Sequence, residues 1–95
     1  MKFQCECGHV IHDVTDYQDN KARFVPDETH EAMLESIDEG LDHYSAFRKY
    51  QRHMFQCVNC CRLHVMNNEG EFISFKPDNK INFGILKGLV NTANT

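Results

Sequence analysis

Four cysteines in two closely spaced pairs are the residues of this sequence best suited to chemistry. Cys5 and Cys7 are separated by one residue, and Cys57 and Cys60 by two. Each close pair of thiolates can supply one edge of the tetrahedron in which Zn²⁺ is bound. A site made of four thiolates has no open position for water, so its metal is structural and not catalytic. We therefore expect one structural Zn²⁺ per chain, bound by Cys5, Cys7, Cys57 and Cys60.

The remaining cysteine and the nearby histidines leave alternatives to this ligand set. The sequence contains five cysteines, an odd number, so Cys61 could replace its neighbour Cys60. Four histidines adjoin the two cysteine clusters and could each replace a thiolate: His9, His12, His53 and His64. A histidine beside a thiolate site more often donates a hydrogen bond or faces solvent. The lack of an export signal predicts a cytoplasmic protein, where paired cysteines bind metal in preference to forming disulfides.

Motifs for catalysis, phosphate binding and membrane insertion are absent from the sequence. His30-Glu31 resembles the start of H-E-x-x-H, but Leu34 stands where the second histidine belongs. There is no glycine-rich phosphate loop and no serine in a nucleophile elbow. A metal-dependent hydrolase would need an open metal position and a general base, and the sequence indicates neither. No apolar run approaches the roughly 18 residues of a membrane span. We therefore expect neither an enzyme nor a membrane protein.

Short strands are expected on both sides of each cysteine pair. Residues 2–4 and 9–14 predict two strands around the turn that contains Cys5 and Cys7, with Gly8 suited to a positive φ. Residues 22–25 predict a further strand. Residues 62–66 and 72–75 predict a hairpin around a turn at residues 67–70. These elements indicate an α+β fold built from antiparallel β-hairpins, in one domain because 95 residues cannot form two cores.

One amphipathic helix is expected between the two cysteine pairs, over about residues 28–51. Asp27 precedes it as an N-cap, and Gly40 marks a bend or a close contact. Apolar residues recur every three or four positions and predict one continuous stripe: Met33, Ile37, Leu41, Tyr44, Phe47 and Tyr50. After Pro77, glycines interrupt the apolar pattern, which predicts a packed coil or a short helix.

The second cysteine pair resembles part of a known family. Residues 57–63, Cys-Val-Asn-Cys-Cys-Arg-Leu, are similar to the zinc-ribbon pattern C-x-x-C-G-R-L, with Cys61 at the usual glycine position. Residues 3–11 and 72–78 also resemble small bacterial zinc-ribbon proteins. The resemblance implies that Cys60 is the ligand and Cys61 the spare thiol. It implies a single zinc-ribbon-like domain over residues 1–95, with the helix inserted into it, and it implies no activity.

The distribution of charge indicates the kind of partner. Eleven acids and three bases lie in residues 1–47, whereas three acids and seven bases lie in residues 48–95. We expect the acidic helix to bind a basic protein through a set of carboxylates: Glu28, Glu31, Glu35, Asp38, Glu39 and Asp42. The same acids would also suit the helix dipole or simply solubilise the surface. Small acidic single domains of this composition are similar to immunity proteins and antitoxins, so we expect an inhibitor of a basic toxin domain.

A nucleic-acid-binding zinc ribbon with a regulatory role is the alternative function. Seven bases could gather on one face, with Phe55 and Phe75 nearby: Arg48, Lys49, Arg52, Arg62, Lys76, Lys80 and Lys87. The formal net charge of −4 and the absence of a longer basic cluster argue against nucleic acid as the main partner.

Overall fold

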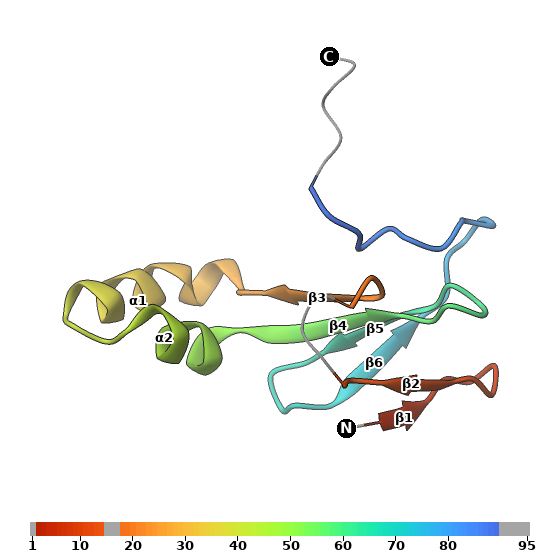
Figure 1. Cartoon of the computed structure of the whole chain (residues 1–95), viewed down its shortest axis with the longest axis horizontal. Coiled ribbons are helices and arrows are strands. Elements are labelled where there is room, and N and C mark those ends of the chain that lie inside the picture. Colours follow the sequence, from red (N-terminus) through yellow and green to blue (C-terminus); the bar gives the residue numbers. More distant parts are fainter. Residues whose placement is uncertain (1, 15–17, 90–95) are drawn as a thin grey trace, which may run out of the picture.

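The chain folds into two antiparallel sheets and two helices, the mixed α+β class expected from the sequence (Figure 1). The structure is a computed structural model, and it describes residues 2–14 and 18–89. In chain order the elements are β1 (Lys2–Gln4), β2 (Val10–His12), β3 (Lys21–Phe24), α1 (Asp27–Asp38), α2 (His43–Tyr50), β4 (Arg52–Gln56), β5 (Leu63–Met66) and β6 (Phe72–Phe75). Strands β1 and β2 pair with each other, and the larger sheet has the order β3-β4-β5-β6. Residues 78–89 form an irregular coil.

The β5–β6 hairpin lies where the sequence predicts it. Leu63 pairs with Phe75 and Met66 with Phe72. The turn between the strands is closed by Asn67, whose Oδ1 accepts hydrogen bonds from the backbone N–H groups of residues 69 and 71, both at 2.9 Å. An asparagine side chain that replaces a backbone acceptor in this way is a common device of tight turns.

The expected single helix over residues 28–51 is divided into α1 and α2. Gly40 has a φ of +110°, in the left-handed region that ends a helix. Asp42 then begins α2, since its side chain accepts from the Ser45 N–H at 3.4 Å. The N-cap predicted at Asp27 is wrong: Asp27 is the first residue of α1, and Pro26 precedes it without a side-chain cap.

The break at Gly40 also divides the predicted apolar stripe. The two helices pack against each other, and Met33 is the buried residue of α1 and Ala46 that of α2. Tyr44 and Phe47, which were expected to continue the stripe, are 71% and 44% exposed. The second helix therefore presents aromatic side chains to solvent.

The core lies between the small β1–β2 sheet and the larger sheet. Cys5, Ile11, Phe55 and Cys57 are its buried residues. Phe3 stacks on Phe72 with ring centroids 4.8 Å apart and contacts the edge of Phe55 at 5.7 Å. Because these contacts pack β1 against the larger sheet, they bring the two cysteine-containing turns to the same end of the molecule.

The two helices lie at the opposite end of the long axis from these turns (Figure 1). Strand β4 connects the two ends, since it follows α2 directly and leads into Cys57. Neither helix of the described residues is long and apolar enough to cross a membrane.

Candidate metal centre

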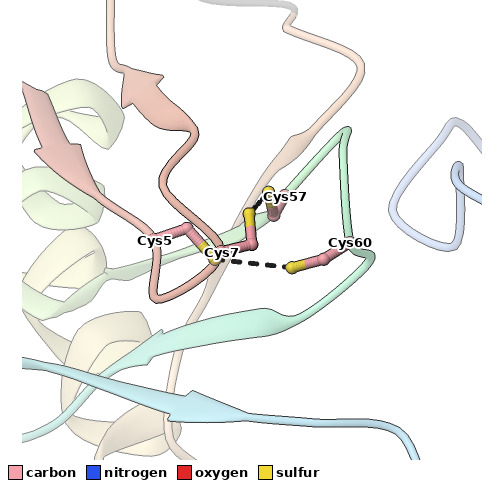
Figure 2. A group of neighbouring side chains, drawn as sticks. All are labelled: Cys5, Cys7, Cys57 and Cys60. Atoms are coloured by element: carbon pink, nitrogen blue, oxygen red, sulfur yellow. Dashed lines mark hydrogen bonds between the residues drawn. The ribbon is translucent and has the colours of Figure 1, made fainter.

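The first cysteine turn joins β1 to β2. The Cys5 N–H donates to the carbonyl oxygen of His9 at 2.8 Å, and the Gly8 N–H donates to that of Cys5 at 2.9 Å. Gly8 has a φ of +97°, which an L-residue adopts only at a cost. These bonds close a tight turn that directs the side chains of Cys5 and Cys7 to one side (Figure 2).

The second cysteine turn joins β4 to β5. The Cys57 N–H donates to the carbonyl oxygen of Arg62, and the Cys61 N–H to that of Cys57, both at 2.9 Å. Cys61 has a φ of +66° and is the sole non-glycine residue with a positive φ in the part of the chain that the structure describes. Cys61 therefore holds a left-handed backbone conformation, which glycine adopts at less cost.

The four cysteines predicted as ligands lie together, with their sulfur atoms facing one another (Figure 2). All four Sγ atoms lie within 4.8 Å of one another, with Cys5 and Cys60 in contact at 3.5 Å and Cys7 and Cys57 at 3.6 Å. Tetrahedral zinc with Zn–S bonds of about 2.3 Å separates its sulfurs by about 3.8 Å, whereas a disulfide separates them by about 2.05 Å. The distances therefore fit four ligands around a metal ion and not two disulfides.

The alternative ligands lie outside this cluster. No histidine or carboxylate of the described residues joins the four sulfurs. His64 is buried in the core, with its ring 5.2 Å from that of Phe3. His53 lies on β4, paired with Arg23 of β3. Cys61 is half-buried and directs no sulfur into the group.

Burial and hydrogen bonds give the four thiols different pKa values in the absence of metal. Hydrogen bonds, first from the Asn59 side chain and then from the His9 backbone, lower the pKa of Cys7 to about 6. Burial raises the pKa of Cys57 to about 12 and also raises that of Cys5. Burial likewise opposes ionisation of Cys60, but hydrogen bonds from Arg62 outweigh it and its pKa is lowered. Metal binding would release protons, because a thiol must be deprotonated to become a ligand.

Two polar side chains support the sulfur atoms from outside. Arg62 donates from Nη1 to the Cys60 sulfur at 3.3 Å, and its Nε lies 4.0 Å from a carboxylate oxygen of Glu6. Asn59 donates from Nδ2 to the Cys7 sulfur at 3.5 Å. Such donors orient metal ligands and offset the negative charge that four thiolates leave around a divalent ion. This role of Asn59 and Arg62 is not apparent from the sequence, because both donors depend on how the two cysteine turns pack together.

Gln56 connects the second cysteine turn to the C-terminal coil. Its side chain is fully buried, and its Oε1 accepts from the N–H groups of Gly84 at 2.9 Å and Ile85 at 3.2 Å. Its Nε2 donates to the carbonyl oxygen of Cys61 at 3.5 Å. A buried amide with its acceptor and one donor satisfied is costly to replace. The sequence offers no local signal for this role, because the partners lie about thirty residues away.

The acidic residues predicted to bind a partner lie on and directly after α1. All six are exposed, and none forms an ion pair within residues 2–14 and 18–89. Four of them are spaced by three, four and three residues along α1, so they share one helix face: Glu28, Glu31, Glu35 and Asp38. Glu39 ends α1, and Asp42 caps α2.

The bases predicted to form a nucleic-acid surface are distributed over both ends of the molecule. Arg48 and Lys49 lie on α2, at the helical end, whereas Arg62 lies beside the cysteines. Lys87 lies 3.9 Å from Asp19. Arg52 lies over the ring of Phe24 at 5.8 Å.

Comparison with known proteins finds a family model that matches most of the chain. The model of a domain of unknown function, DUF8617, matches residues 1–79, which include both cysteine pairs, both helices and all six strands. No curated protein and no solved structure matches the chain. The match ends before Gly84 and Ile85, the residues that bind Gln56. This chain belongs to the DUF8617 family.

Proposed function

We propose that this protein is a zinc-ribbon-type binding module in which one structural Zn²⁺ joins the two cysteine turns. The observation that supports this proposal is the group of four sulfur atoms, all within 4.8 Å of one another. Zinc is the metal most often held by four thiolates in a structural site, with no coordination position left for water. The ion would crosslink turns about 50 residues apart in the sequence, in a domain with few buried side chains.

The zinc site can be tested by metal content together with thiol titration. Full-length protein purified without chelator is expected to contain one zinc ion per chain, with four protected thiols and one titratable thiol at Cys61. Cys60→Ala should lose zinc, whereas Cys61→Ala should retain it. Less than one zinc per chain, or the loss of zinc from both variants alike, would contradict the proposed ligand set.

The same proposal assigns binding of a basic protein to the acidic face of α1. Exposed carboxylates without ion pairs create a negative field that accelerates association with a positively charged partner. A closed metal site leaves the module without a catalytic centre, so its action would be binding itself. An immunity-type inhibitor of a basic toxin domain, acting in the cytoplasm where the thiols remain reduced, fits this description.

Charge reversal on α1 tests the partner proposal. Glu31→Lys combined with Glu35→Lys should reduce the association rate with the partner recovered from native cells at least about tenfold at low salt. The matched control, Glu69→Lys with Glu71→Lys, changes the same charge on the exposed β5–β6 turn. Equal rates for the two double variants would exclude the acidic face of α1 as the binding surface.

A further inference from the structure

A cavity lies at the helical end of the molecule, between α2 and strands β3 and β4. Its volume is about 600 Å³, within the range of small-molecule sites. Phe24, Tyr44 and Phe47 form its aromatic walls. It lies away from both the sulfur cluster and the acidic face of α1, so a ligand here does not depend on the function proposed above.

The polar groups that line this cavity favour an anion. Within residues 2–14 and 18–89, Arg23 and Arg48 line it and no carboxylate does, although the whole chain has a formal net charge of −4. Arg48 is exposed, and its guanidinium lies over the ring of Tyr44, 5.6 Å from the centroid. Among the described residues, Arg48 therefore has no carboxylate partner, and its guanidinium donors are available to a ligand.

Gln51 adds a further polar group to the lining of the cavity. Its side-chain amide makes no hydrogen bond within the described residues. The ring of His53 also lines the cavity, but its Nδ1 is buried and is not available to a ligand. The amide can donate and accept in one plane, which is how a planar heterocycle is recognised at its edge. Aromatic walls, an edge-reading amide and an arginine are also the groups that bind unstacked bases and their phosphates.

We propose that this cavity binds a nucleotide, with the base against Tyr44 and Phe47 and the phosphate on Arg48. The spacing on α2 supports this division. Residues 44, 47 and 48 lie on one face of the helix, because they are three and four positions apart. The aromatic rings and the guanidinium therefore reach the same ligand from one element. Gln51 follows the helix at the next position on that face.

The test is an NMR titration of the full-length, zinc-loaded protein with AMP, adenosine and inorganic phosphate. AMP is expected to shift the backbone amide signals of β3 and α2 at millimolar concentration or below, and to bind more tightly than either fragment. Arg48→Gln should weaken the binding of AMP at least about tenfold and leave the binding of adenosine unchanged. Tyr44→Ala should weaken the binding of both AMP and adenosine at least about fivefold. Both side chains are exposed, so the variants should fold.

Lys49→Gln is the matched control, since it removes the same charge from the next residue of α2 but lies outside the cavity. Its effect on AMP should stay below about twofold. A single-stranded tetranucleotide of adenosines distinguishes two sources of the nucleotide. If the tetranucleotide binds more tightly than AMP, the natural ligand is a nucleic-acid strand. If it binds equally or more weakly, the ligand is a free nucleotide. No AMP-induced shift in α2 or β3, or equal effects of Arg48→Gln and Lys49→Gln, would overturn the proposal.

Discussion

Replacement of Cys61 by glycine should stabilise the protein. At a φ of +66°, Cys61 holds a left-handed conformation that costs an L-residue about 1–2 kcal/mol. Glycine removes that cost but gains conformational freedom in the unfolded chain, worth about 0.4–1 kcal/mol. The backbone hydrogen bonds of Cys61, to Cys57 and from Gln56, do not involve its side chain and would remain. We expect Cys61→Gly to raise the free energy of unfolding by about 0.5–1 kcal/mol.

The measurement is urea denaturation of the zinc-loaded protein at one fixed concentration of free zinc. Cys61→Ala is the matched control, because alanine removes the thiol but keeps the Cβ that makes a positive φ unfavourable. The alanine variant should therefore have about the stability of the natural protein. Zinc content should remain one per chain in both variants, since the Cys61 sulfur lies outside the cluster.

Two results would refute this reasoning about Cys61. If the glycine and alanine variants were equally stable, the backbone at this position would not be strained. If Cys61→Gly lost zinc while Cys60→Ala retained it, the ligand would be Cys61, and the second turn would hold the metal differently.

Two other buried side chains give predictions for stability. Gln56→Leu should lower the free energy of unfolding by about 1–3 kcal/mol, because the N–H groups of Gly84 and Ile85 lose their acceptor. Hydrogen exchange at these two amides should accelerate. Gln4→Leu, at an exposed position, is the control. Unchanged exchange at both amides would exclude the proposed anchoring of the coil. Burial lowers the pKa of His64, so the folded state stays neutral while the unfolded chain binds a proton below about pH 6.5. The free energy of unfolding should therefore fall as the pH decreases from 7 to 5, with at most about 1.4 kcal/mol per pH unit coming from His64. Urea denaturation of His64→Phe should show a smaller decrease with pH. An equal decrease in both proteins would contradict the burial argument.

The two cysteine turns were predictable from the sequence because the geometry of each turn is local. Each pair needs a tight turn, and the strand patterns on both sides of Cys5–Cys7 and Cys57–Cys60 predict where those turns lie. The β5–β6 hairpin was predictable for the same reason, since Asn67 and Gly70 favour a turn between two apolar segments.

The helical segment was predicted as one continuous helix, whereas the structure has two. A spacing of three and four residues persists from Met33 to Tyr50, and periodicity alone cannot detect that the chain turns between two helices that each follow it. Gly40 and Asp42 carried the signal, as a helix C-terminal glycine followed by an N-cap. The exposed Tyr44 and Phe47 follow from that break, because α2 then packs through Ala46 instead of continuing the stripe.

Contacts between distant residues account for what the sequence could not indicate. The hydrogen bonds of Gln56 to residues 84 and 85, and that of Asn59 to the Cys7 sulfur, depend on the packing of segments that are far apart in the chain. Neither residue type is unusual at its position, so only the assembled core distinguishes them from ordinary surface amides.

One strand connects the candidate metal centre to the proposed binding surfaces at the helical end. Strand β4 begins at Arg52, next to the helical end, and ends at Gln56, directly before Cys57. Its pairing with β3, from Phe24–Arg52 to Lys21–Phe55, fixes both chain connections of the α1–α2 segment to the larger sheet. Loss of the metal would free the cysteine turns first, while this β-ladder and the α1–α2 contact keep the two helices together. We therefore expect binding at the helical end to persist after metal removal, as long as β3 and β4 remain paired.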